Sequence, residues 1–104
     1  MGWRVEYIQE ALDDFRSLDH SQQIPVLKAI KKVSENPLPQ SEGGYGKPLG
    51  ARGGVSLSGL LKIKLRGLGL RVVYRLKREG SSMQIIVISV RDDNTVYKLA
   101  ESRK

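Results

Sequence analysis

The sequence has no cysteine and a single histidine, His20, among its 104 residues. Without cysteine there are no disulfide bonds and no thiolate metal sites, and nothing argues against a reducing compartment. With one histidine, the chain has little of the side chain that most often transfers protons near neutral pH. We therefore expect no metal and no other cofactor, so any acid–base chemistry must come from other groups.

Long apolar runs are also missing. None approaches the roughly 20 residues that a membrane-spanning helix requires. The N-terminal sequence MGWRVEYIQE lacks the apolar core of a signal peptide. We expect a soluble, cytoplasmic protein that does not act at a membrane. The length leaves room for one modest core, so residues 1–104 are predicted to form a single domain.

Acidic residues are absent from the middle of the chain. The formal net charge is +7, and its source lies between Glu42 and Glu79, where nine Lys or Arg residues are accompanied by no Asp or Glu. Such a block favours a polyanionic partner. A solvated surface that aids solubility is the alternative explanation of the charge excess alone.

Apolar periodicity in the first third of the chain predicts a strand followed by a helical hairpin. Trp3, Val5 and Tyr7 alternate with charged residues, as in a half-buried strand of about six residues. Apolar residues at helical spacing begin at about residue 9, and a second apolar stripe follows a cap predicted at Ser21. Pro25 then falls near the first turn of the second helix, where proline is tolerated.

Residues 37–59 contain seven of the 11 glycines and three of the four prolines, which predicts a long irregular connection. Its segment Gly43–Lys47 superficially resembles a phosphate-binding loop. We reject that motif because Pro48 occupies the Ser/Thr position and no strand precedes it.

Three strand-like runs follow and predict an antiparallel meander. They cover residues 58–66, 69–78 and 83–91. A final short helix is predicted over residues 93–103, with Val96, Leu99 and Ala100 on one side. The expected fold class is therefore α+β, in the order strand, two helices, three-stranded meander and helix.

Period-two geometry divides the first two strands of the meander into an apolar face and a basic face. The apolar set is Leu61, Ile63, Leu65, Leu70, Val72, Tyr74 and Leu76. The basic set is Lys62, Lys64, Arg66, Arg71, Arg75 and Lys77. Like charges on neighbouring strands repel each other, so a purely structural sheet would more often mix the signs. This arrangement favours an anionic ligand.

The third strand is nearly all apolar, as expected of a strand covered on both sides, and it ends at Arg91. Tyr97 follows on the predicted helix. It is either a packing residue or an aromatic ring on which a nucleobase stacks.

The stretch Lys62–Tyr74 (KIKLRGLGLRVVY), followed by Val87–Arg91 and by Val96 and Tyr97, resembles the signature of RelE toxins. The resemblance implies a RelE-like fold of the microbial ribonuclease type. It also implies a toxin of a type II toxin–antitoxin system, a ribosome-dependent endoribonuclease that cleaves mRNA in the A site and inhibits translation. The positions that match the signature are the implied catalytic residues: Lys62, Lys64, Arg71, Arg91 and Tyr97.

Partners follow from the same resemblance. It implies an acidic RelB-like antitoxin, the ribosome with its mRNA, and operator DNA bound by the toxin–antitoxin complex. Further RNA contacts are predicted at other cations of the basic block, namely Lys47, Arg52, Arg66 and Arg75. The sequence departs from the family pattern in a shorter segment between Val90 and Tyr97 and in a longer glycine-rich loop.

RNA can be cut by its own 2′-hydroxyl, which leaves a 2′,3′-cyclic phosphate and a 5′-hydroxyl. Lys64 is the candidate base, since Lys62, Arg66 and Arg71 are expected to lower its pKa from the ordinary value of about 10.4. Lys62 and Arg71 would bind the phosphate. Arg91 would assist the leaving oxygen, and Tyr97 would stack on a base.

Two other functions remain open at this stage. A ParE-like toxin has a similar fold but inhibits DNA gyrase, and its relatives generally lack the set of cations. A non-catalytic basic module would only bind RNA phosphates. The scarcity of histidine also suggests a substrate aligned from outside, and the ribosome would supply that alignment.

Overall fold

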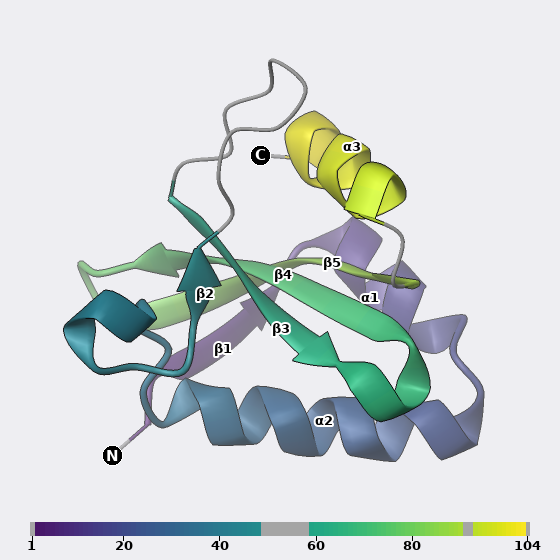
Figure 1. Ribbon diagram of the computed structural model, residues 1–104, viewed down its shortest axis with the longest axis horizontal. Helices are drawn as coiled ribbons and strands as arrows, with labels where there is room; N and C mark the ends of the chain where they lie inside the picture. Colours follow the sequence, from purple (N-terminus) through teal and green to yellow (C-terminus); the bar gives the residue numbers. More distant parts are fainter. Residues whose placement is uncertain (1, 49–58, 91–92, 104) are drawn as a thin grey trace.

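A mixed five-stranded sheet organises the computed structural model, which describes residues 2–48, 59–90 and 93–103 (Figure 1). In chain order its elements are β1 (Arg4–Tyr7), α1 (Gln9–Arg16), α2 (His20–Ser34), the 3-10 turn η1 (Gln40–Glu42), β2 (Lys47–Pro48), β3 (Leu60–Leu65), the 3-10 turn η2 (Arg66–Leu68), β4 (Leu70–Lys77), β5 (Ser82–Val90) and α3 (Asp93–Arg103). The strand order is β1-β5-β4-β3-β2, with β1 parallel to β5 and the other pairs antiparallel. The predicted α+β class and order of main elements are confirmed.

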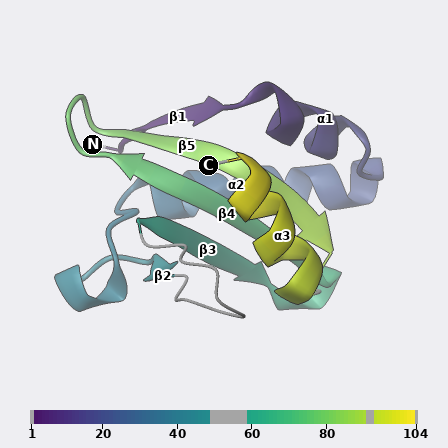
Figure 2. The ribbon, with the colours of Figure 1, turned by 90° about the horizontal axis from the view of Figure 1, so that it is seen from above.

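Helices cover both faces of the sheet. In Figure 1, α2 runs below the sheet and α3 lies above it. Seen from above, α3 lies in front of the strands and α2 behind them (Figure 2). The lower face packs Val26 and Ile30 of α2 against Ile63 and Val72, and the upper face packs Val96 and Ala100 of α3 against the sheet. We call these the lower and upper faces below.

The strand β5 is apolar on both sides because both sides are covered. Met83, Ile85 and Ile88 belong to the lower cluster, whereas Ile86 and Val87 belong to the upper one. A register shift opposite the Val73–Tyr74 step of β4 places the extra residue in β5. The prediction of a strand covered on both sides is confirmed. The extra residue in β5 was not predicted, because the alternation of residues along a strand does not reveal a bulge.

The edge of β5 is completed by side chains where β1 ends. β1 pairs with β5 only as far as Ile85. Beyond it, the N–H of Ile88 donates to Asp14 Oδ2 (3.1 Å), and Arg103 Nη1 donates to the carbonyl of Ile86 (3.0 Å). Arg103 and Asp14 also form an ion pair at 2.7 Å. These two backbone groups of the edge are thereby satisfied, and the end of α3 is fixed to α1 and β5.

The start of α2 differs from the prediction. The cap is Asp19 and not Ser21, so the helix begins at His20. The N–H of Asp19 donates to Gln22 Oε1 (3.2 Å), which closes the first turn. Pro25 therefore lies in the second turn. The first strand is also shorter than predicted, at four residues.

The predicted irregular connection over residues 37–59 is only partly irregular. Its described part contains η1 and the strand β2, and residues 49–58 lie outside the described residues. β2 is too short to show periodicity, which is why the sequence does not reveal it. Pro48 is compatible with a strand here because β2 is at the edge of the sheet, where a missing N–H is tolerated.

No helix in the described part of the chain combines the length and the apolar character that crossing a membrane would require.

Candidate active site

Four cations gather on the upper face of the sheet. Leu61 and Ile63 of β3 point to the lower cluster, so the alternating Lys62 and Lys64 lie on the upper face. The registers pair Lys64 with Arg71 and Lys62 with Lys47. We call the residues Lys47, Lys62, Lys64 and Arg71 the cation cluster. The prediction that Lys62, Lys64 and Arg71 share a face is confirmed.

Arg71 is more buried than an exposed basic surface implies. Its exposed fraction is only 5%. It lies between β3 and β5 in the sheet, opposite Lys64 on one side and Ser89 on the other. Because an arginine stays charged even when it is desolvated, Arg71 provides a fixed positive charge at this position.

Neighbouring charges lower the pKa of Lys64. The largest cause is Lys62, followed by Lys47, burial, Arg71 and Arg66. Crowding by Lys62, Arg66 and Arg71 was expected from the sequence, whereas the second-largest cause, Lys47, was not. Lys47 comes from the unrecognised strand β2, and only the β2–β3 pairing shows that it adjoins Lys62. A lowered pKa increases the neutral fraction of Lys64, which is the form that accepts a proton.

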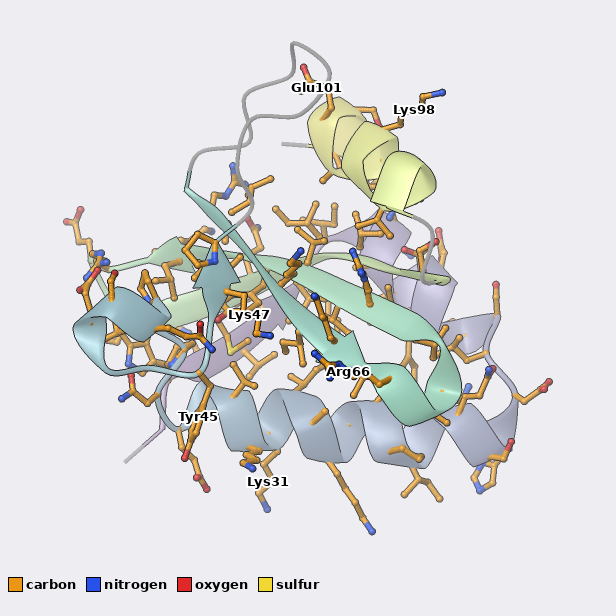
Figure 3. All side chains as sticks on the ribbon, viewed as in Figure 1. Lys31, Tyr45, Lys47, Arg66, Lys98 and Glu101 are labelled. Atoms are coloured by element: carbon orange, nitrogen blue, oxygen red, sulfur yellow. The ribbon has the colours of Figure 1, made fainter. Side chains whose placement is uncertain are left out.

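The remaining described cations of the basic block lie outside the cation cluster. Arg66 is exposed in η2, at the turn that follows β3 (Figure 3). Arg75 donates to Gln84 Oε1 at 2.7 Å. Lys77 pairs with Glu6 at 3.3 Å. The block is free of acids along the chain but not in space, because Glu6 on β1 reaches it.

Arg78 at the end of the block is also paired with an acid. Its two terminal nitrogens bind both oxygens of Glu42, at 3.0 and 2.7 Å. This bidentate pair raises the pKa of Arg78 and lowers that of Glu42. Arg78 is therefore held by Glu42 at the end of the block, away from the cation cluster.

Three predicted site residues lie wholly or partly outside the described part of the structure. Arg91 and Arg52 lie outside the described residues. Tyr97 belongs to α3, but the structure does not describe its side chain. Since Val96 and Ala100 pack on the upper face, α3 covers the same face as the cation cluster. The roles of these three residues remain predictions.

His20 is distant from this arrangement in the fold. It is an exposed residue at the start of α2, on the opposite face of the sheet. Among the described residues, no group of three or more His, Cys, Asp or Glu side chains is placed to hold a metal ion. The described part of the site therefore offers lysine and arginine nitrogens for chemistry.

Comparisons with known proteins identify the family. No protein-family model matches the chain. A RelE-like toxin protein from Escherichia coli is 30% identical over 104 residues, which cover 99% of this chain and 98% of that protein. This chain belongs to the RelE-like toxin family.

Solved structures agree with this assignment. A doubly substituted E. coli RelE toxin in the free state has a TM-score of 0.75 and 25% identity, with 99% of this chain and 98% of that chain covered. The same toxin variant bound to a peptide of the antitoxin RelB has a TM-score of 0.69 and 25% identity, with 96% and 95% covered. The RelBE2 toxin–antitoxin complex of Mycobacterium tuberculosis has a similar fold, with a TM-score of 0.58.

The membership confirms the RelE-like fold that the signature between Lys62 and Tyr97 implied. In this RelE-like toxin, Lys62, Lys64 and Arg71, the three described basic residues among the implied catalytic positions, lie together on β3 and β4. The catalytic roles of these residues remain to be proposed from their geometry.

Proposed function

We propose that this RelE-like toxin is a ribosome-dependent endoribonuclease that cleaves mRNA in the A site and thereby inhibits translation. The supporting observation is the cation cluster, in which a lysine with a lowered pKa lies directly opposite a buried arginine. A surface that only binds phosphates has no need of a lysine that loses its proton readily. Base catalysis does need one.

The reaction begins when neutral Lys64 Nζ takes the proton of the 2′-hydroxyl. The 2′-oxygen then attacks the adjacent phosphorus, and the bond from phosphorus to the 5′-oxygen breaks. The products are a 2′,3′-cyclic phosphate and a 5′-hydroxyl, once the leaving oxygen receives a proton. Arg91 is proposed to assist that oxygen, with its geometry outside the described residues.

Lys62 and Arg71 are proposed to stabilise the negative charge that builds on the phosphate oxygens. Arg71 suits this task because burial holds its guanidinium in place before the substrate arrives. Fixed charges need no reorganisation during the reaction and act more strongly where water is excluded. Tyr97 is proposed to stack on a nucleobase.

Substrate binding extends beyond these groups. The charges of Lys47 and Arg66 lower the pKa of Lys64, so both residues lie near it. Both are proposed to contact RNA phosphates. Arg75 and Arg52 are further candidates, although Arg75 would have to share its guanidinium with Gln84. Each contact would add affinity that weakens with salt.

The ribosome is proposed to align the scissile bond. The described site has no histidine near it and relies on a lysine, so its acid–base power is limited. Alignment by an external scaffold can lower a barrier by several kcal/mol. A ribosomal substrate would place the activity in the cytoplasm.

An acidic RelB-like antitoxin is the proposed inhibitor of this activity. The comparison structures include a RelE toxin bound to a RelB peptide. The net charge of +7 favours an acidic partner. The resulting complex is proposed to bind operator DNA, with residues 1–104 acting as one toxin domain.

Cell-free translation followed by primer extension on the mRNA tests the proposed function. The wild-type toxin should produce cuts phased with codons in the A site. Lys64→Ala should reduce the cleavage rate by roughly 100-fold or more, because general base catalysis contributes that much. Lys77→Ala, which removes an exposed lysine already paired with Glu6, should leave cleavage nearly unchanged. Intact mRNA accompanied by inhibited DNA gyrase would instead indicate a ParE-like toxin, and RNA binding without cuts would indicate a binding module.

A further inference from the structure

Residues 36–48 form a tightly bonded segment between α2 and β3, which we call the arm. Backbone hydrogen bonds close the arm on itself. The N–H of Gln40 donates to Gly46 O (2.9 Å), and the N–H of Gly46 donates to Leu38 O (3.0 Å). The N–H of Tyr45 donates to Asn36 O (3.0 Å). The arm therefore has a defined shape despite its many glycines and prolines.

The arm is anchored to the core by Tyr74. The hydroxyl of this completely buried tyrosine donates to the carbonyl of Pro37 at 2.7 Å. Gly46 packs directly against the same hydroxyl. A methyl group on Gly46 would collide with Tyr74 Oη and lie 2.6 Å from Leu61 Cδ2. The close approach requires glycine at this position.

The anchored arm places Lys47 in the cation cluster. Lys47 directly follows Gly46 and pairs with Lys62 in the register of β2 and β3. Pro48 pairs with Leu61 in the same register. The charged end of Lys47 consequently adjoins Lys62 and Lys64 from the edge of the sheet.

The charges that act on Lys64 come from several elements around it. Cations come from β2, β3, β4 and η2, namely Lys47, Lys62, Arg71 and Arg66. On α3, which packs on this face, the described charged residues are Lys98, Glu101 and Arg103, and Arg103 is bound to Asp14. Lys47 lowers the pKa of Lys64 more than Arg71 does, although Arg71 is the direct partner of Lys64 in the sheet.

We propose that the arm is part of the active site and that Lys47 is a positioning residue, held beside Lys62 so that its positive charge acts on Lys64. The inference rests on the proposed function for the role of Lys64 as a base. The coupling between the two lysines, however, exists without substrate and is measurable without cleavage. This role would be a function for the first part of the glycine-rich connection, which is to hold Lys47 in the cation cluster.

Titration of the Lys64 side chain by NMR in the whole protein tests the coupling. The pKa of Lys64 should lie below its ordinary value in the wild type and should rise in Lys47→Met, which removes the charge but keeps an unbranched chain. Lys47→Arg should retain the low pKa. Lys31→Met is the matched control, because Lys31 is exposed on α2 at the opposite face and its loss should leave the pKa of Lys64 unchanged.

The arm itself is tested by Gly46→Ala. The added methyl group forces the arm away from Tyr74, so the pKa of Lys64 should rise as it does in Lys47→Met. Gly67→Ala is the control, since a methyl group at that position meets nothing within 4 Å. If Gly46→Ala does not fold, the Lys47 variants decide the question alone.

Cleavage of ribosome-bound mRNA gives a second readout. In Lys47→Met, the rising limb of the pH–rate profile should move to higher pH, and each unit of movement lowers the neutral fraction of Lys64 at pH 7 about tenfold. An identical pKa of Lys64 in wild type and Lys47→Met would overturn the inference. A coupled Lys64 in a protein that cuts no mRNA would support the coupling and overturn only the proposed ribonuclease function.

Discussion

Lys64 shows how far the role of a single residue depends on its neighbours. Alternation along residues 58–66 predicted its face, and the acid-free block predicted cations around it. The position of Arg71 inside the sheet and the contribution of Lys47 required the strand pairing, because neither is encoded in local periodicity. The sequence therefore predicted which of these cations share a face better than it predicted the burial of Arg71.

The pH dependence of cleavage follows from the pKa of Lys64. A base acts in its neutral form, so the rate should rise with pH until the lowered pKa of Lys64 is passed and then level off. Lys64→Arg should stay nearly inactive across this range, since arginine does not deprotonate in proteins. Single-turnover rates on ribosome-bound mRNA measure both effects. An active Lys64→Arg variant would contradict the assignment of Lys64 as the base.

Tyr74 is the residue on which the arm depends most. Tyr74→Phe leaves the buried carbonyl of Pro37 without its donor, which should lower the free energy of unfolding by about 1–3 kcal/mol. Chemical denaturation measures this loss. Tyr45→Phe is the control, because Tyr45 is 49% exposed and its substitution should cost less than about 0.5 kcal/mol. Equal losses in the two variants would contradict the anchoring role.

Burial of Tyr74 also predicts an alkaline effect on stability. Its pKa is raised by burial, so the folded state favours the protonated hydroxyl. The stabilisation is complete below the ordinary tyrosine pKa of about 10 and is lost progressively as the pH rises above it. The free energy of unfolding should decline more steeply above that pH in the wild type than in Tyr74→Phe. Parallel declines in the two proteins would show that Tyr74 does not contribute.

At the level of elements, long and regular segments were predicted well and short ones were not. β3 and β4 alternate clearly and β5 is a long apolar run, and these three strands and α3 were predicted to within a few residues. The strand β2 has only two residues and exists because β3 offers it an edge. The cap at Asp19 was missed because several polar residues near the start of α2 are acceptable caps.

The docking of α3 depends on Arg103 as well as on apolar packing. The side chains of Arg103 and Asp14 are 14% and 20% exposed, and Arg103 also binds Ile86 O. Arg103→Ala should lower the free energy of unfolding by about 1–3 kcal/mol, because a largely buried charge loses its partner. Arg16→Ala, which removes an exposed arginine 4.0 Å from Asp13, should change it by less than about 0.5 kcal/mol. Comparable effects would contradict a specific role for Arg103.

At the level of the whole molecule, the distribution of charge distinguishes the cation cluster from the rest of the basic block. Arg75, Lys77 and Arg78 have polar or acidic partners on other segments. Because the cluster surrounds the proposed base Lys64, the affinity for a non-cleavable single-stranded RNA should depend on it. Lys62→Ala should reduce the slope of log affinity against log salt by about 0.7, the value for one phosphate contact.

Lys77→Ala provides the comparison for that measurement, since Lys77 already pairs with Glu6. Its effect on the slope should be clearly smaller than that of Lys62→Ala. Equal slopes in the two variants would mean that RNA contacts the whole block uniformly.

The most direct test of the central claim compares the same mRNA free in solution and bound to programmed ribosomes, in single-turnover reactions with the purified toxin. The wild type should cleave ribosome-bound mRNA roughly 1,000-fold faster or more, as expected when alignment lowers the barrier by several kcal/mol. The products should carry 2′,3′-cyclic phosphate and 5′-hydroxyl ends, and Lys64→Ala should lose the reaction. Equal rates on free and ribosome-bound mRNA, or cleavage retained in Lys64→Ala, would contradict it.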